Sequence, residues 1–424
     1  MNWPTYTLGQ LCEISTGRTP SRSRSDYFGG EHLWVTIGDL NNDVVSDSKE
    51  RITDLALSET NIQPVAPGTV LLGYKLSLGK LGIAGTPLYT NEAIAALPPR
   101  PSVRLLNKFL LYALNRVDYL ALCHGAAKGN CLNRASLERI KLSLPPITEQ
   151  RRIVEILDQA DALRRKSDEA DAKSDRILPA LFYKMFGNPD TNTLGWTRVA
   201  LGKLLKKEKG ALQSGPFGSN LHNSDFVDEG SVLAVGIDNV HDSGFNLGRN
   251  RRITHGKYEE LKKYKLEPGD VLITIMGTVG RTCVFPEWVG KAICTKHVYR
   301  IQTEPDKLDP EFLSASLRLS SKVKTQLGSS ITGQIVDALT SRNLKDLLIE
   351  VPPLTLQRHF AHIKETLDQE ATKRAHSSLN LSNLFQVILS RAFSGDLTAK
   401  WGAAHINELL AEMEEQAKVL SEAC

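Results

Sequence analysis

Polar and cationic side chains gather on loops in two separate parts of the chain. Arginine, lysine, asparagine, glutamine, serine and histidine carry donors that reach phosphate oxygens and the edges of bases. In the first half we expect contacts to DNA from Arg18, Arg22, Arg24, Lys75, Ser77, Lys80, Lys128, Asn130 and Asn133. In the second half we expect them from Ser214, Ser219, Arg249, Arg251, Arg252, Arg281, Lys296, His297 and Gln334. For each residue the alternative is a solvated side chain without a ligand.

The loops differ in how many such residues they hold. The densest is Arg18–Arg24, in which three arginines alternate with small polar residues and a proline. Lys75, Ser77 and Lys80 lie in and beside a glycine-bearing turn that follows a predicted strand. Taken as sets, these loops favour binding to phosphates and bases.

No pattern in the chain predicts catalysis. A phosphate-binding loop requires Gly, four residues and then Gly-Lys-Ser/Thr, whereas five residues separate Gly73 from Gly79 and a leucine follows Lys80. The Asn-Pro-Pro-aromatic signature of amino-methylating enzymes is missing, because the Asn-Pro step at 188 continues with aspartate. Cys294 and His297 are too few to supply the four ligands of zinc. We therefore expect no catalytic residue, no metal site and no cofactor in this chain.

Length and composition fit a globular protein of two or three domains. The chain has 424 residues, 41% hydrophobic and 24% charged, with a formal net charge of +4. That charge permits binding to nucleic acid if the basic residues cluster, without requiring it. The N-terminus lacks a secretory pattern, and no apolar run is long enough to predict a membrane helix. Because the six cysteines include no Cys-x-x-Cys pair, we expect reduced thiols and a cytoplasmic location.

The most informative feature is a long internal repeat. Leu144–Arg151 (LPPITEQR) corresponds to Val351–Arg358 (VPPLTLQR), 207 residues further along. Pro67–Leu72 corresponds to Pro268–Ile273, and each is followed by a glycine and a basic residue. Small insertions between these segments change the offset, as loops do between diverged copies of one domain. The chain therefore contains two copies of one domain.

Both copies have the same predicted order of elements. Strands separated by glycine- and proline-rich turns are expected at 33–37, 69–72, 232–237 and 271–275. A helical segment is expected at 105–122 in the first copy and at 311–327 in the second. The Pro-Pro steps then stop the chain, because proline cannot donate to a ladder and disfavours helix just before it.

A long helix is predicted after each Pro-Pro step, since small and apolar residues recur there at the three-and-four spacing of a coiled-coil seam. The seam positions are Ile153, Ile156, Ala160, Leu163, Ser167, Ala170, Ser174, Ile177 and Leu181, and then Phe360, Ile363, Leu367, Glu370, Arg374, Ser377, Leu381, Leu384 and Ile388. We expect antiparallel pairing, with Glu370 and Arg374 opposite Arg164, Arg165 or Asp171. Pro179 should end or kink the first helix. The alternative is that each helix packs on its own domain.

In their order and duplication these motifs resemble the specificity subunits of Type I restriction–modification enzymes. The resemblance also includes Lys184–Pro189 and Phe393–Leu397 after the two helices, and Ser15–Pro20 and Leu212–Gly218 early in the two copies. It covers residues 3–398 and rests on the set of motifs, none of which is specific alone. The copies differ where the first has Arg-Thr-Pro at 18 and the second has Pro-Phe-Gly at 216, so contacts in one cannot be transferred to the other.

The resemblance implies an α+β fold with two homologous target recognition domains, each a mixed β-sheet with helices. A long antiparallel two-helix coiled coil would separate them, with pseudo-two-fold symmetry. The expected parts are a first recognition domain at 1–146, a central helix at 147–186, a second recognition domain at 187–353, a C-terminal coiled-coil helix at 354–398 and a helical extension at 399–424.

The resemblance also implies a function. Each domain would read one half of a bipartite site in double-stranded DNA, as a non-catalytic subunit. Its partners would be two modification (methyltransferase) subunits and restriction (translocase/endonuclease) subunits, which would bind S-adenosylmethionine, ATP and Mg²⁺. Two alternatives remain: a tandem-domain scaffold that binds only protein, and an enzyme whose site has no recognisable motif.

Overall fold

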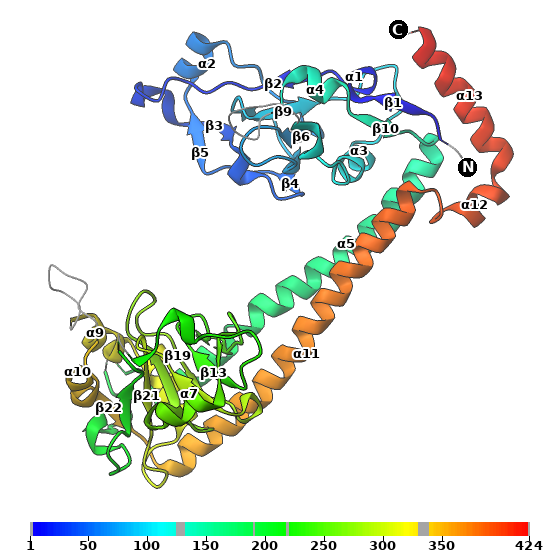
Figure 1. The fold of residues 1–424 in the computed structure, drawn as a ribbon. Coiled ribbons are helices and arrows are strands. Elements are labelled where there is room, and N and C mark those ends of the chain that lie inside the picture. The colour runs from blue at the N-terminus through cyan, green and yellow to red at the C-terminus, as the bar shows by residue number, and fades with distance from the viewer. Residues whose placement is uncertain (1–2, 124–131, 190, 218–219, 330–338, 423–424) are drawn as a thin grey trace. The chain divides into compact units, whose positions relative to one another are not determined.

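The computed structural model describes residues 3–123, 132–189, 191–217, 220–329 and 339–422. It consists of two compact units, of which the first comprises residues 1–167 with 378–424 and the second comprises residues 168–377. Each unit holds one globular domain, the start of one long helix and the end of another. These helices are α5 (Ile147–Ser174) and α11 (Leu354–Phe393) (Figure 1).

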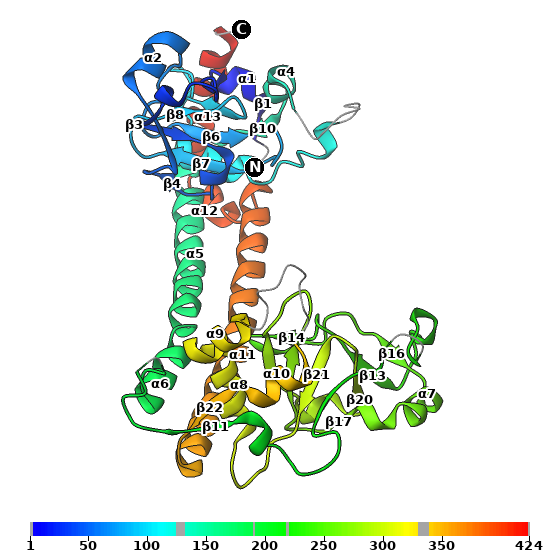
Figure 2. The ribbon, with the colours of Figure 1, turned by 90° about the vertical axis from the view of Figure 1, so that its left-hand side faces the viewer.

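The described part of the first domain contains ten short strands. They are β1 (Thr5–Thr7), β2 (Ser15–Thr16), β3 (Phe28–Val35), β4 (Val44–Val45), β5 (Glu50–Ile52), β6 (Val70–Gly73), β7 (Leu81–Ala84), β8 (Tyr89–Thr90), β9 (Ile94–Leu97) and β10 (Lys141–Ser143). Its helices are α1 (Leu8–Leu11), α2 (Asp54–Thr60), α3 (Asn107–Leu114) and α4 (Arg134–Glu138). The main sheet has the order β2-β9-β6-β7-β4, a second sheet has β5-β3-β8, and β1 pairs with β10. Figure 2 shows β6 and β7 adjacent in the main sheet.

The second domain repeats this arrangement. Its strands are β11 (Thr197–Ala200), β12 (Leu212–Ser214), β13 (Val232–Val235), β14 (Val240–His241), β15 (Gly244–Phe245), β16 (Arg252–Ile253), β17 (Lys265–Leu266), β18 (Val271–Thr274), β19 (Thr282–Val284), β20 (Ala292–Cys294), β21 (Val298–Ile301) and β22 (Leu348–Val351). Its unit also contains α6 (Ile177–Phe186), α7 (His255–Glu260), α8 (Pro310–Leu319), α9 (Ser321–Ser329) and α10 (Ser341–Asp346).

Sheet order confirms that the two domains are copies. The order β12-β21-β18-β19 matches β2-β9-β6-β7, β16-β13-β20 matches β5-β3-β8, and β11-β22 matches β1-β10. Register is also shared, since Val70 pairs with Leu97 where Val271 pairs with Ile301. The first domain adds β4 to its main sheet, and the second adds β17 to its smaller one. The predicted α+β fold with two homologous domains is therefore confirmed.

Two helical segments are shorter than the sequence predicts. The segment expected at 105–122 contains α3 only to Leu114, whose carbonyl oxygen accepts a hydrogen bond from the Tyr119 hydroxyl (2.9 Å). The segment expected at 311–327 is two helices, separated at Ser320. The backbone of Ser320 is extended, and its hydroxyl accepts from the Val323 amide in the first turn of α9 (3.4 Å). Local hydrogen bonds by such side chains compete with helix continuation.

The glutamine of each Gln-Arg step connects a long helix to its domain through hydrogen bonds to backbone groups. Gln150 is fully buried; its Nε2 donates to the carbonyl oxygens of Arg104 (3.0 Å) and Pro145 (2.9 Å), and its Oε1 accepts from the Leu106 amide (2.9 Å). Gln357 makes the same three bonds in the second domain, to the equivalent positions Lys307, Pro352 and Asp309. The motif therefore has a structural explanation: one amide side chain joins the loop before α3 or α8, the proline step and the helix start.

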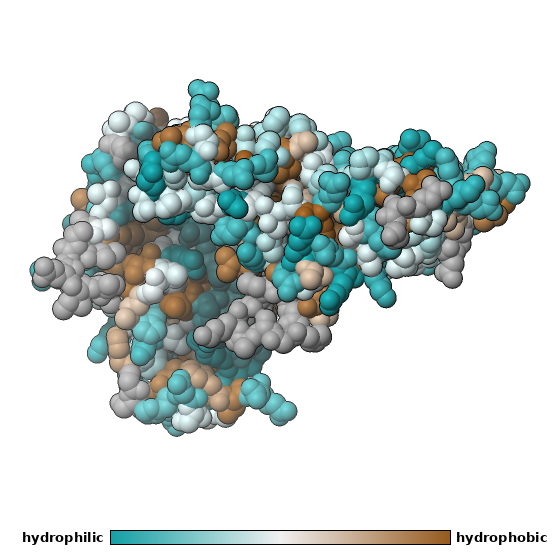
Figure 3. Space-filling model, turned by 90° about the horizontal axis from the view of Figure 1, so that it is seen from above, coloured by the Kyte–Doolittle hydropathy of each residue, from teal (hydrophilic) through white to brown (hydrophobic). Residues whose placement is uncertain are grey.

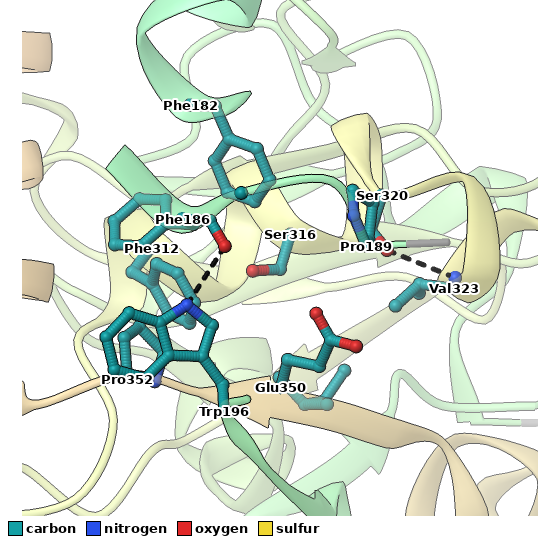
Figure 4. Close-up of a pocket in the computed structure, with 12 residues that line it drawn as sticks. Phe182, Phe186, Pro189, Trp196, Phe312, Ser316, Ser320, Val323, Glu350 and Pro352 are labelled. Atoms are coloured by element: carbon teal, nitrogen blue, oxygen red, sulfur yellow. Dashed lines mark hydrogen bonds between the residues drawn. The ribbon is translucent and has the colours of Figure 1, made fainter. Parts of the chain in front are cut away.

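Aromatic side chains fix the end of the central helical segment on the second domain. Phe186 of α6 lies 4.7 Å from the Phe312 ring of α8 and 5.3 Å from Phe360 of α11. Figure 4 shows Phe186 and Phe312 together with Phe182, and the Trp196 indole donating to the carbonyl oxygen of Phe186 (2.9 Å). The cavity between them is about 20 Å³, which is room for one water molecule. The cluster is therefore a packed core and not a ligand site.

The end of α11 packs on the first domain in the same way. Phe393 lies 5.1 Å from Phe109 of α3, and Phe385 lies 6.4 Å from Tyr112. The start of α5 and the end of α11 thus share a core with the first domain, and α6 and the start of α11 share one with the second.

The two helices pair antiparallel within each unit, as predicted. In the first unit the hydroxyls of Ser167 and Ser378 are 2.8 Å apart, and the Arg164 guanidinium lies over the Phe385 ring. In the second unit Arg374 forms the predicted ion pair with Asp171 (3.3 Å).

Three details of the predicted seam are wrong. Glu370 pairs with Lys373 on its own helix instead of across the seam. Leu163 and Leu384 are 58% and 53% exposed, because the cores of the domains fix the helix faces and bury Leu157 and Phe385 in their place. A three-and-four spacing tolerates more than one rotation of a helix, and the packed domain selects among them.

The break expected near Pro179 occurs before it. Helix α5 ends at Ser174, and Pro179 lies in the first turn of α6. Proline is tolerated in a first turn but would collide with the carbonyl four residues earlier in a continuous helix, which is the carbonyl of Asp175.

The C-terminal segment belongs to the first unit. Helix α12 (Ala399–Ala404) is followed by α13 (Ile406–Glu422), whose Gln416 donates to the Leu144 carbonyl oxygen (3.3 Å). Glu149 is 2% exposed, and its carboxylate accepts from the Trp3 indole (2.9 Å) and the Thr398 hydroxyl (2.6 Å). The extension therefore covers the junction between the first domain and α5.

Hydrophilic residues cover most of the face shown in Figure 3, and hydrophobic residues form small patches between them. None of the described helices combines the length and apolar character of a membrane span. Within the same residues, no three His, Cys, Asp or Glu side chains gather as a metal site would require.

Candidate nucleic-acid interface

A rigid turn joins β6 to β7 in the first domain and carries three of the predicted residues. The Gly73 amide donates to the Lys80 carbonyl oxygen (2.7 Å), and the Gly79 amide donates to that of Gly73 (2.9 Å). Gly79 has φ +78°, and a Cβ there would lie 2.7 Å from the Tyr119 ring, so glycine is required on both grounds. Between these fixed ends Lys75 is half-buried, while Ser77 and Lys80 are exposed.

A second turn, between β8 and β9, lies against the first. The Tyr74 amide donates to the Ala93 carbonyl oxygen (3.0 Å), and the Tyr74 hydroxyl donates to that of Glu92 (3.0 Å). The Leu132 amide donates to the Tyr74 carbonyl oxygen (3.0 Å), which brings the segment that contains Asn133 to the same edge. Three loops from distant parts of the sequence therefore meet around Tyr74.

The arginine loop joins this edge. The Arg18 amide donates to the Thr90 carbonyl oxygen (2.9 Å), and the Thr19 hydroxyl bonds to the Glu92 carboxylate. A Cβ at Gly17 would overlap the Thr90 carbonyl, so this glycine permits the close approach. The structure thus brings the start of the arginine loop, the β6–β7 turn with Lys75, Ser77 and Lys80, and the segment of Asn133 to one edge.

The second domain builds the same edge from equivalent bonds. The Ile275 amide donates to the His297 carbonyl oxygen (3.0 Å), and the Gly280 amide donates to that of Thr274 (2.9 Å). A Cβ at Gly215 would overlap the Cys294 carbonyl, as at the equivalent Gly17. The β18–β19 turn therefore lies beside the β20–β21 turn that carries Lys296 and His297.

The loop that contains Arg251 also approaches this edge. The Arg251 guanidinium pairs with Asp238 (3.2 Å). Gly236 lies beside both that guanidinium and the Thr295 side chain. A Cβ added at Gly236 would be 2.7 Å from the Arg251 Nη1 and 3.7 Å from the Thr295 Oγ1. Arg251, Lys296, His297 and the hairpin of Arg281 are accordingly neighbours in the fold, although about 45 residues of sequence separate the first from the third.

Ion pairing separates the predicted cations into two groups. Arg22 pairs with Glu50 and stacks over the rings of Phe28 and Trp34 (4.7 and 4.9 Å), and Arg24 pairs with Asp26 (2.7 Å). Like Arg251, both would have to exchange a carboxylate for a phosphate. In contrast, seven of the predicted cations have no ion-pair partner among the described residues: Arg18, Lys75, Lys80, Arg249, Arg252, Arg281 and Lys296. Such side chains can bind an anion without first losing a carboxylate.

A cationic groove lies beside the second hairpin. Its lining includes residues 277–281 of the turn, Arg318 of α8, Lys324 of α9 and one carboxylate, that of Asp242. Neither Arg318 nor Lys324 was predicted from the sequence, because isolated bases on helices carry no motif. Together with Arg281 they place three positive charges where a phosphate backbone could lie.

The remaining predicted residues have varied surroundings. Arg18 is exposed and donates to the Thr60 carbonyl oxygen (3.1 Å). The Asn133 Oδ1 is the N-cap of α4 and accepts from the Ser136 amide (2.8 Å). Arg249 is exposed, and the Nε of Arg252 donates to Asn250 (2.9 Å).

Ser214 is not on a loop, contrary to expectation. It lies in β12 opposite Tyr299 and is 8% exposed, since the strand continues further than the glycine-rich sequence suggests. Four predicted residues fall outside the residues that the structure describes: Lys128, Asn130, Ser219 and Gln334.

His297 is held in its neutral form. Burial, and then the positive charge of Lys296, lower the pKa of its imidazole from the ordinary value of 6.5. The Nδ1 lies 3.1 Å from the Met276 sulfur. At neutral pH His297 can therefore act as a hydrogen-bonding group but adds no positive charge.

Glu92 is a candidate that sequence reasoning missed. It is exposed at the β8–β9 turn, in the position that Lys296 occupies in the second domain. A carboxylate beside phosphates is repelled, but it can accept from the amino group of cytosine. Aligning the two copies at Ile94 and Val298 would have paired Glu92 with Lys296, since both lie two residues earlier.

Comparisons with known proteins point to one family. The family model described as Type I restriction modification DNA specificity domain matches residues 1–170 and 195–381. The MjaIX specificity subunit of Methanocaldococcus jannaschii is 26% identical over 50% of this chain and 53% of that relative, so this match spans about half of its length. The StySPI specificity subunit of Salmonella potsdam is 23% identical over 95% of this chain and 90% of the relative. The crystal structure of the S subunit from M. genitalium has a similar fold, with a TM-score of 0.55 at 15% identity over 93% of this chain and 96% of that one.

Proposed function

Because the chain belongs to the family of Type I restriction–modification DNA specificity proteins, we propose that it reads a bipartite DNA site with its two domains. Each domain binds one half-site through the edge formed by the two turns and the neighbouring loops. The chain supplies sequence recognition, and the chemistry belongs to its partners.

One observation carries this proposal: the same edge is built twice. The bond from Tyr74 to Ala93 in the first domain is repeated from Ile275 to His297 in the second, at equal length. The backbone framework is therefore constant, whereas the side chains on it differ. A conserved framework with different side chains is what two readers of different bases require.

The side chains suit two kinds of contact. Lys75, Lys80 and Arg281 are placed to neutralise phosphates, which gives affinity without sequence information. Glu92 and Lys296 occupy one position in the two domains and have opposite hydrogen-bonding roles, acceptor and donor. They are our candidates for the difference between the half-sites.

The partners follow from the same premise. We infer that two modification subunits and the restriction subunits assemble on this chain in the cytoplasm, and that S-adenosylmethionine, ATP and Mg²⁺ bind to those partners. Exposed apolar side chains on the helix pair of the first unit support a partner surface there. They are Leu163, Leu379, Leu384 and Val387, each 53–58% exposed.

Exchange of one domain tests the proposal. Residues 3–144 would be replaced by the matching domain of another specificity subunit, and methylated adenines would be mapped across the genome in cells that carry the hybrid. We expect one half-site to change and the other to stay. The reciprocal exchange of residues 197–351 is the matched control and should change only the other half-site.

Salt dependence distinguishes DNA reading from a protein scaffold. Because bound phosphates release counterions, the affinity of the assembled methyltransferase core should fall steeply between about 50 and 200 mM salt, by as much as ~1,000-fold if six phosphates are contacted. An affinity that does not change with salt, or a hybrid that changes both half-sites, would contradict the proposal.

A further inference from the structure

The β6–β7 turn carries a leucine in an unusual position. Leu76 is 82% exposed, the highest value among the exposed large hydrophobic residues of the described chain. Its φ is +61°, in the left-handed region. A branched side chain disfavours this backbone, and an exposed apolar side chain gains nothing from burial. Neither property helps the domain to fold, so a contact outside the chain is the more economical explanation.

The turn holds Leu76 firmly. Three residues before it, the Gly73 amide is bonded to Lys80, and three residues after it Gly79 packs against Tyr119. Tyr74, two residues before Leu76, is 5% exposed and is bonded through both its amide and its hydroxyl to the β8–β9 turn. The apolar side chain is therefore presented from a fixed base, as recognition by contact requires.

Positive charge surrounds the leucine. Lys75 precedes it, with its Nζ over the Tyr74 ring (5.3 Å), and Lys80 closes the turn. Neither lysine has an ion-pair partner among the described residues. An apolar side chain between two cations is complementary to DNA, because apolar groups of the bases lie there between two rows of phosphates. A protein partner would be expected to bury the lysines against carboxylates.

The second domain repeats the feature with different residues. Met276 is 41% exposed in the equivalent turn, and the next residue, Gly277, has φ +72°. The left-handed position is thus shared by both turns, with glycine in one and leucine in the other. Glycine is the residue that this backbone favours. The backbone conformation therefore does not explain why the first domain has leucine at this position.

We propose that Leu76 reads a thymine by packing on its C5 methyl group in the major groove. The inference rests on the proposed function. A two-stranded hairpin fits the major groove, and the thymine methyl is the apolar group exposed there. Leu76 is then a specificity-determining residue of the first half-site.

A thermodynamic cycle tests this contact. The full chain is assembled with its modification subunits and bound to a labelled duplex that carries the methylation site mapped in its own cells. Thymines are replaced one at a time by uracil, which removes only the methyl group. The protein is either wild type or Leu76→Asn, because asparagine tolerates the left-handed backbone. Leu55→Gln, on α2, is the control for loss of an exposed leucine elsewhere in the domain; Leu55 is 39% exposed.

We expect wild type to lose about fourfold in affinity at one uracil position of the first half-site, the value of one buried methyl group. Leu76→Asn should bind the thymine duplex about tenfold more weakly and lose nothing further at that uracil. It should be at least as resistant to thermal unfolding as wild type, because the backbone strain is relieved. Leu55→Gln should bind like wild type.

Several results would overturn the inference. One is equal affinity of Leu76→Asn and wild type for the thymine duplex. Another is that uracil weakens binding by Leu76→Asn by the same factor as it weakens binding by wild type. A third is failure of Leu76→Asn to assemble with the modification subunits, which would make Leu76 a protein contact. In each case wild type would still prefer its own site to a scrambled duplex. If wild type shows no such preference, the proposed function itself fails.

Discussion

The buried glutamines Gln150 and Gln357 offer a quantitative test of how each recognition domain is held on its helix. Substitution by methionine keeps the length of the side chain and removes both hydrogen-bonding groups. Each glutamine makes three hydrogen bonds to backbone groups and is 0% exposed. At about 1 kcal/mol for each bond, either substitution should cost about 3 kcal/mol, because the backbone partners stay buried without replacement.

Hydrogen exchange is the suitable assay, since a chain of two units does not unfold in one transition. In Gln150→Met the amide of Leu106 loses its acceptor, so peptides that contain it should exchange about 100-fold faster, as 3 kcal/mol requires. Peptides that contain Asp309 should be unchanged. Gln357→Met should give the reverse pattern, which makes the two variants controls for each other.

An exposed glutamine supplies a second control. Gln63 lies on the surface of the first domain, and Gln63→Met should alter exchange by no more than about 0.5 kcal/mol. If neither buried substitution accelerates exchange more than about fivefold, which is about 1 kcal/mol, the three bonds do not hold the helix to the domain. If both substitutions accelerate exchange in both domains, the units are not independent.

Three further predictions address reading, spacing and pH. Glu92→Gln should change the base preference of the first half-site and leave the second unaltered when methylated adenines are mapped, and an unchanged first half-site would remove Glu92 as a reader. Insertion of one heptad near Ala170 and one near Arg374 keeps the seam in phase and adds up to about 10 Å, so the unread spacer should lengthen by at most about three base pairs. An active insertion variant with the original spacer would show that the helices do not set it. Burial raises the pKa of Asp270, which is 4% exposed, despite its bonds from the Glu267 amide and Gln302. The folded state therefore holds this proton more tightly than the unfolded state, and the second unit should lose stability as pH rises from about 3.8 through the raised pKa. Asp270→Asn should lack this loss in urea unfolding at each pH, and a wild-type–variant difference that is constant with pH would contradict the reasoning.

Much of the fold was predictable because its signals are local. The Pro-Gly steps before Val70 and Val271 predicted strands, and both residues begin one. The Pro-Pro steps predicted the starts of the long helices, since proline stops a strand and fits the first turn of a helix. The repeat predicted two domains of one kind, which the shared sheet order confirms.

The candidate site was predictable only in part. Lys75, Ser77 and Lys80 were placed correctly on a turn, because the glycine pattern determines such a turn within a few residues. The burial of Ser214 and the ion pair of Arg22 with Glu50 were missed, since each depends on a strand or loop distant in sequence. The outward orientation of Leu163 was missed for the same reason.

The sequence by itself therefore determined which segments become strands, turns and helices, that they occur twice, and which family they resemble. Such properties depend on backbone preferences over a few residues and on comparison of the chain with itself. Only the tertiary structure decided that the turn of Tyr74 meets that of Ala93, that Ser214 is buried in a strand, and that Leu76 is exposed on a left-handed backbone. These facts depend on contacts between residues far apart in the chain, and packing of the whole domain fixes them together.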